Sequence, residues 1–313
     1  QNFPIILNVT LAEDNSVLTV KMSEALYNTN GGSGTLEASD FIFSISGGTA
    51  TLSSATPSSI TPESGNVYKL GISLSGNPNG NEKLVINPVD NSIYDVAGNE
   101  MSTTQENNWA YLNDKVVPFI TSVTLASDNS SLAVSINEAV FNTTGGSGIL
   151  QESDFAFSIS GGTATLTSTT PSSINISGNV YTLGIPLSGV PDGSEILVVN
   201  PVDDSIYDAD DNEASTSQQN NSVSLNDITL PTITSVSATN ADGTYGIEKV
   251  VVVTVTFSEV VNVVGTPQLT LETGSADAVV NYSSGSGSSI IKFNYTVSVG
   301  DFSSDLDYTS KDA

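Results

Sequence analysis

The sequence repeats itself at a spacing of about one domain. Pro4, Pro118 and Pro231 open three segments, so successive segments begin 114 and 113 residues apart. The stretch DFIFSISGGTATL at Asp40 returns as DFAFSISGGTATL at Asp154. A period of this length means that one structural unit is copied along the chain. Any fold assigned to this chain must therefore be one that can be repeated.

Each copy is predicted to be a series of short strands. Apolar and polar residues alternate from Ser16 to Met22 and again from Tyr68 to Leu74, the period of two that half-buried strands show. About seven such runs in roughly 110 residues are typical of an immunoglobulin-like sandwich. We predict an all-β protein: tandem immunoglobulin-like Greek-key β-sandwiches arranged as a rod. The units are repeat one (1–116), repeat two (117–229) and a third segment (230–313).

The third segment diverges from the other two. Its opening PTITSV matches PFITSV of repeat two, and VTVTFSEVV aligns with LAVSINEAV. The closing run DLDYTSKDA is predicted to be the sixth strand leading into the next loop, so the unit is incomplete and its last strand is missing. We expect that strand to follow Ala313 in the same chain, with donation by another chain as the alternative.

The charge of the chain is strongly negative, with 34 acidic and 7 basic residues and a net charge of -27. Nucleic acid is not an expected partner, because phosphate binding needs Lys and Arg. No apolar run is long enough for a membrane helix, so no membrane insertion is expected. Unscreened negative charge opposes compaction, and bound cations would offset it. Solubility in salty surroundings is the simpler alternative.

The chain contains neither cysteine nor histidine. Disulfides, thiolate or imidazole metal sites and histidine-based catalytic triads are therefore excluded. Ions that bind oxygen ligands, such as calcium, remain compatible with the composition.

Acidic residues are predicted to gather at one end of each sandwich. In a Greek-key sandwich the loops between the second and third strands and between the sixth and seventh strands lie at the same pole. That pole would hold Glu24, Asp40, Asp95 and Asn99 in repeat one, and Glu138, Asp154, Asp208, Asp210 and Asn212 in repeat two. Solvated loop acids are the alternative, and the EDNS and SDNS turns are better explained by side chains capping backbone amides.

The junctions between segments carry a second repeated motif. The stretch YLNDKVVPFI at Tyr111 returns as SLNDITLPTI at Ser224. The first linker would deliver Asn113 and Asp114 to the pole of repeat two, and the second would deliver Asn226 and Asp227 to the third segment, opposite Glu259. Calcium binds six to eight oxygens at about 2.3–2.6 Å, which such a convergence would supply. We therefore predict calcium sites at the domain junctions.

These motifs resemble known families. The LND…P.I linker is similar to that of cadherin repeats, and the SE after the second strand, together with YDVAGN, resembles the tandem bacterial Ig-like repeats, SwmB-type and cadherin-like, of giant surface adhesins. The stretch TNADGTYGIEKVVVVTVTFSEVV matches one such repeat. The resemblance implies an exported stalk on a bacterial cell surface, its signal peptide removed before QNF. It would be the N-terminal part of a gliding-motility adhesin secreted by a type IX system. The DADDN of repeat two departs from the family pattern Asp-x-x-Gly-Asn.

The expected function is therefore non-enzymatic adhesion or spacing. Its partners would be calcium ions, further repeats of the chain, a secretion or anchoring machinery, and an extracellular surface or glycan. Catalysis by paired carboxylates is not expected in duplicated stalk-like units. The alternative is a carbohydrate-binding sandwich, which would use exposed aromatic residues. Trp109, replaced by Ser222 in repeat two, is the candidate, although packing against a neighbouring segment would also explain it.

Overall fold

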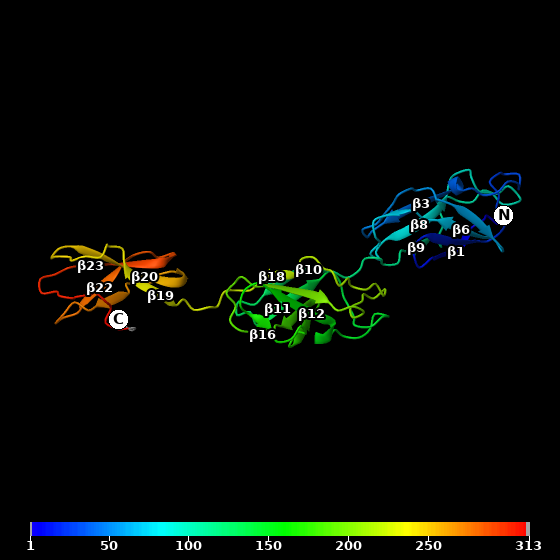
Figure 1. The fold of residues 1–313 in the computed structure, drawn as a ribbon. Coiled ribbons are helices and arrows are strands. Elements are labelled where there is room, and N and C mark those ends of the chain that lie inside the picture. The colour runs from blue at the N-terminus through cyan, green and yellow to red at the C-terminus, as the bar shows by residue number, and fades with distance from the viewer. Residues whose placement is uncertain (1, 311–313) are drawn as a thin grey trace. The chain divides into compact units, whose positions relative to one another are not determined.

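The computed structural model describes residues 2–310, which form an all-β protein of antiparallel sheets (Figure 1). Helical structure in this range is limited to two 3-10 turns, η1 (Ala38–Asp40) and η2 (Glu152–Asp154), and no helix there could span a membrane. The chain divides into two compact units, Gln1–Asp227 and Ile228–Ala313. The first unit contains both close repeats, and the second contains the third segment.

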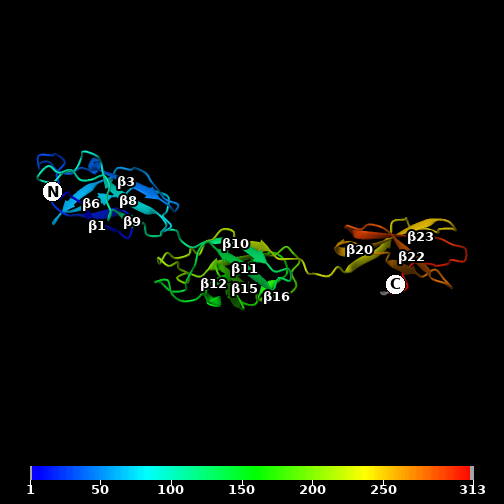
Figure 2. The same cartoon turned by 180° about the vertical axis from the view of Figure 1, so that it is seen from behind.

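Repeat one has the strand order of an immunoglobulin-like sandwich. One sheet has the order β1-β2-β6-β5, and the other has the order β3-β8-β9, with a short β4-β7 pair beside them. Figures 1 and 2 both show β3, β8 and β9 together. These sheets correspond to the A-B-E-D and C-F-G sheets of the constant-type fold. The strands are β1 (Ile6–Leu11), β2 (Val17–Met22), β3 (Phe41–Ser46), β4 (Thr51–Leu52), β5 (Ile60–Glu63), β6 (Val67–Gly71), β7 (Leu74–Ser75), β8 (Lys83–Pro88) and β9 (Trp109–Tyr111).

Repeat two reproduces this topology. Its sheets have the orders β10-β11-β15-β14 and β12-β17-β18, with β13-β16 as the short pair. The predicted all-β class and its sandwich character are therefore confirmed for the two close repeats. The strands are β10 (Ile120–Leu125), β11 (Ser131–Ile136), β12 (Phe155–Ser160), β13 (Thr165–Leu166), β14 (Ile174–Ser177), β15 (Val180–Gly184), β16 (Leu187–Ser188), β17 (Ile196–Pro201) and β18 (Ser222–Ser224).

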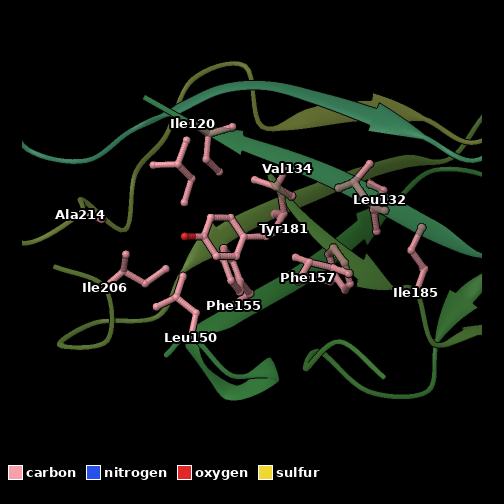
Figure 3. Packing of buried hydrophobic residues seen from close by; sticks show 14 of the residues in the cluster. Ile120, Leu132, Val134, Leu150, Phe155, Phe157, Tyr181, Ile185, Ile206 and Ala214 are labelled. Carbon is pink, nitrogen blue, oxygen red and sulfur yellow. The ribbon is translucent and has the colours of Figure 1, made fainter. Parts of the chain in front are cut away.

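The alternation in the sequence becomes a buried core between the two sheets. In β11, Leu132 and Val134 are buried while their neighbours are partly exposed. Figure 3 shows these side chains facing Phe155 and Phe157 of β12, with Tyr181 between the layers. Each large apolar side chain buried in this way contributes about 1.5–3 kcal/mol. Repeat one has its own core of equivalent residues, so each of the two repeats can hold its loops in place independently.

The third segment forms one continuous sheet of order β19-β20-β23-β22-β21. Strand β22 pairs with β21 along its N-terminal part and with β23 near its C-terminal end. A single hydrophobic core includes residues from strands at opposite ends of this sheet. The strands are β19 (Ile233–Ala238), β20 (Val250–Val261), β21 (Gln268–Leu271), β22 (Ala278–Ser284) and β23 (Ser288–Thr296).

The sixth strand predicted for DLDYTSKDA does not form in the described part of this run, residues 305–310. Tyr308 makes a single antiparallel bridge to Leu271. Two backbone hydrogen bonds flank it, from Glu272 to Asp307 and from Thr309 to Thr270. A strand needs a ladder of such pairs, and here the partner strand β21 ends at Leu271. Residues 311–313, the end of the predicted run, lie outside the described residues.

Candidate metal site in the first unit

The linker that leaves repeat one is first tied back to repeat one. The Asn113 side-chain amide donates to the carbonyl oxygens of Ala12 and Glu13, at 3.0 and 3.1 Å. The buried Asn15 side chain binds both the N–H and the carbonyl of Asn113, at 2.8 Å each. The amide of Asn113 therefore anchors the exit of repeat one, rather than reaching the pole of repeat two as predicted.

The next residue, Asp114, does reach repeat two. Its carbonyl oxygen accepts a hydrogen bond from the Asn212 amide at 3.2 Å, and its carboxylate oxygen Oδ1 accepts one from Val116 N–H at 2.8 Å. The second bond closes a turn within the linker, and the first connects the linker to the loop that follows β17. Asp114 is thereby held at the acidic pole predicted for repeat two.

Three carboxylates meet at this point. One carboxylate oxygen from each of Asp114, Glu138 and Asp208 lies within 4.8 Å of the other two. Glu138 follows β11, and Asp208 lies in the loop after β17, so the three come from separate parts of the sequence. Asp208 is buried, with 1% of its surface exposed, and the other two are half-buried. Within residues 2–310 no other group of three acids comes this close.

Asp208 is fixed by its own loop. Its Oδ1 accepts hydrogen bonds from the N–H groups of Asp210 and Asn212 at 2.8 Å, and its Oδ2 accepts one from the Asn212 amide at 2.7 Å. Asp211 has a positive φ of 66°. It occupies the place of Gly98 (φ 81°) in repeat one, so DADDN forms the same turn as DVAGN, because Asp tolerates this region better than most residues.

The electrostatics of the group favour a cation. Burial raises the pKa of Asp114. The negative charges of Asp208, Asp210 and Glu82 raise this pKa further, whereas the hydrogen bond from Val116 lowers it. Burial also raises the pKa of Glu138, and nearby Asp208 and Asp114 add to this, whereas the hydrogen bond from Asn137 lowers it. Both shifts mean that the ionised forms are destabilised by their surroundings, which a bound positive charge would reverse.

The donor set suits calcium in its chemistry. Calcium prefers hard oxygen ligands, and Asp114, Glu138 and Asp208 offer carboxylate oxygens only. Asp210 is exposed on the same loop and close enough to influence both half-buried acids. Asn212, which was predicted as a ligand, uses its amide to donate hydrogen bonds to Asp114 and Asp208. These bonds help to position the two acidic residues.

Two of the predicted ligands have a structural explanation. The Oδ2 of Asp40 accepts a hydrogen bond from Glu37 N–H at 2.7 Å, and Asp154 accepts the equivalent bond from Gln151 at 2.7 Å. Each closes a capping box on the short 3-10 turn before the third strand. Asp154 lies outside the group of three acids formed by Asp114, Glu138 and Asp208.

The predicted residues of repeat one form no close group of acids in the described part of the chain. Asp95 is buried, and its carboxylate accepts hydrogen bonds from Ala97 N–H and from both the N–H and the amide of Asn99, at 2.7–2.8 Å. Glu24 is half-buried beyond β2. The loop geometry around Asp208 of repeat two is thus present around Asp95 of repeat one, but within residues 2–310 no carboxylate equivalent to that of Asp114 joins it there.

The second linker starts as the first does. The Asn226 amide donates to the carbonyls of Ala126 and Ser127, at 3.1 and 3.3 Å. Asp227 ends the first unit, and Glu259 belongs to the second unit, where the Thr229 hydroxyl lies 3.5 Å from its carboxylate. That Asp227 and Glu259 share an ion stays a prediction.

Two buried acids were missed at the sequence level. Glu82 and its counterpart Glu195 both have 0% of their surface exposed. Glu82 Oε1 accepts hydrogen bonds from Thr49 and Ala50 N–H, at 2.5 and 2.8 Å, and Oε2 accepts one from Asn79 N–H at 3.0 Å. The sequence signal for these buried acids is the repeated SGGT. Its second glycine leaves room for the carboxylate, because a Cβ on Gly48 would lie 2.0 Å from the Glu82 carboxyl carbon.

Comparison with known proteins adds no assignment to this geometry: no protein-family model and no curated protein sequence matches the chain.

Proposed function

We propose that this chain is a non-enzymatic stalk or adhesion module of an exported bacterial surface protein, and that calcium restrains its first domain junction. The observation that carries the proposal is the meeting of Asp114 from the linker with Glu138 and Asp208 of repeat two. A ligand set divided between a linker and the next domain couples the two, whereas a set within one domain would only stabilise that domain.

Three further features support this function. The units are close copies, which suits a spacer, since a stalk grows by duplication of one self-contained fold. The net charge of -27 would be partly offset by bound cations. Sites with few carboxylates in extracellular modules bind calcium with a Kd on the order of 10⁻⁴–10⁻³ M, a range in which the ion would be bound outside a cell and released inside it.

Calorimetry of the full chain tests the calcium site. Saturation at about a hundredfold over Kd adds about 2.7 kcal/mol, a shift in Tm on the order of 10 °C for the unit that binds. Asp114→Asn keeps the shape of the side chain and should weaken calcium binding about tenfold or more, 1.4 kcal/mol. Asp203→Asn is the matched control, because Asp203 is an exposed acid of the same repeat. Equal melts in calcium and in chelator would contradict the proposal.

Solution scattering tests the restraint itself. Domains joined by a short linker with a small interface move relative to one another by default. In calcium, residues 1–228 of the wild type should give a narrow distribution of interatomic distances, and chelator should broaden it. Asp114→Ala should give the broad distribution in both conditions. A variant that still responds to calcium as the wild type does would show that Asp114 is not a ligand.

A further inference from the structure

The outward face of the β3-β8-β9 sheet in repeat one carries two exposed aromatic rings. Trp109 is 44% exposed and Tyr111 is 57% exposed. Their ring centroids lie 5.6 Å apart with the planes at 79°. Trp109 does pack against a neighbouring segment, because Lys83 of β8 lies over its ring, but 44% of its surface stays exposed. Both rings stand on β9, the edge strand of the sheet.

A lysine completes the cluster. Lys83 is paired across the strands with Tyr111, and its Nζ lies 4.3 Å from the centroid of the Trp109 ring. Within residues 2–310 it forms no ion pair. The other outward side chains of this sheet are uncharged: Ser44, Ser46, Asn87 and two aliphatic residues. In a chain with a net charge of -27, this face carries a positive charge and no acid.

Repeat two provides an internal comparison. The same register places Ser222 and Ser224 where the rings stand and Ile196 where Lys83 stands. The buried sides of these strands are nonetheless alike, with Leu197 and Leu84 both fully buried. The sandwich therefore folds without the rings and the lysine, so their role lies outside the stability of the core.

We propose that this face, defined by Lys83, Trp109 and Tyr111, binds an acidic glycan, an oligosaccharide of uronic acids. Aromatic ring faces carry partial negative charge and attract the polarised C–H groups of a sugar ring. The lysine ammonium offers a charge-assisted hydrogen bond to a uronate carboxylate. The small hydroxyl side chains of Ser44 and Ser46 suit sugar hydroxyls better than the apolar centre of a protein interface, whereas the Asn87 amide is already hydrogen-bonded to Asn108.

This binding is independent of the proposed calcium function, so the two can fail separately. The test uses the full chain, a hexamer of galacturonic acid as the probe and a neutral glucose hexamer as the comparison. Trp109 is the single tryptophan of the chain, so its fluorescence reports binding at this face directly. All titrations are run in chelator, which removes calcium bridges between the probe and the acidic loops.

Each variant introduces the residue that repeat two carries at the same position. Trp109→Ser should weaken binding of the uronate hexamer about tenfold or more. Its binding is measured by titration calorimetry, because this variant has no tryptophan fluorescence. Lys83→Ile should remove the preference for the uronate over the neutral hexamer. In the wild type, binding of the uronate hexamer should weaken as the salt concentration approaches about 1 M, where charges are screened beyond about 3 Å. Lys83→Ile should remove this salt dependence. Thermal melts establish that both variants fold.

A gain of function provides the converse test. The triple change Ile196→Lys, Ser222→Trp and Ser224→Tyr should restore binding when made in a chain that lacks the three residues of repeat one. No binding of the uronate hexamer by the wild type would overturn the proposal. So would binding that Trp109→Ser leaves unchanged, or equal affinity for the neutral hexamer.

Discussion

Replacing Glu82 tests whether a buried anion organises the end of repeat one. Its carboxylate accepts hydrogen bonds from the N–H groups of Thr49, Ala50 and Asn79, and the side chain has no exposed surface. In Glu82→Ala these three donors lose their acceptor. An unsatisfied buried donor costs about 1–3 kcal/mol. Because Thr49 is an exposed residue, we expect water to replace the lost acceptor of its N–H, and we therefore expect a total loss of about 3–5 kcal/mol.

The effect should be visible by two measurements. A loss of this size is a large part of the stability of a domain, typically about 5–15 kcal/mol, so urea unfolding should show a first transition at much lower denaturant. Hydrogen exchange should show reduced protection of the three amides. Glu106→Ala, which removes an exposed acid of the same repeat, should change stability by less than about 0.5 kcal/mol.

The dependence on pH gives an independent check. Burial raises the pKa of Glu82, but hydrogen bonds from Ala50, Thr49 and Asn79 outweigh it and hold the pKa below its ordinary value of 4.5. A carboxyl whose pKa is lower in the folded state contributes stability above the unfolded-state pKa and loses it as the pH falls through the folded-state pKa. The difference in stability between the wild type and Glu82→Gln should therefore be largest near neutral pH and shrink in acid. A Glu82→Ala variant within about 1 kcal/mol of the wild type would refute the argument.

Two further changes follow from the same contacts. Gly48→Ala would place a Cβ 2.0 Å from the Glu82 carboxyl carbon at a φ of +58°. It should destabilise the wild type by about 3 kcal/mol but the Glu82→Ala background by only about 1–2 kcal/mol, measured as a double-mutant cycle; additive losses would show that the two residues do not compete for space. Asn113→Ala removes the hydrogen bonds to the Ala12 and Glu13 carbonyls and should cost about 1–2 kcal/mol by urea unfolding. An unchanged midpoint would show that this anchor is not needed.

The sequence by itself determined the fold class and the copying of the unit. Alternation such as Leu132 and Val134 with polar neighbours decides which face of a strand is buried, because side chains point to opposite faces in turn. The spacing of Pro4, Pro118 and Pro231 located the copies. Both features depend only on the order of residues along the chain, so they can be predicted from the sequence alone.

The tertiary structure decided which acids meet. Asn113 and Asp114 are adjacent in sequence, yet the amide of the first binds repeat one while the second joins Glu138 and Asp208. Which side chain faces which domain depends on the backbone path of the linker, set by contacts almost 100 residues away in sequence, such as the Asn15 side chain. Spacing therefore predicted the pole and included all three acids of the group, but it could not separate them from Asn113 and Asp154.

The buried acids illustrate the same limit. In the sequence Glu82 and Glu195 are acids beside a turn and would be placed in solvent, as acidic residues usually are. They are buried because the SGGT turn, more than thirty residues earlier, directs its backbone N–H groups at them and leaves no side chain in the way. Burial of a charge depends on where its hydrogen-bond donors lie in space. Only the folded arrangement of the two loops supplies that.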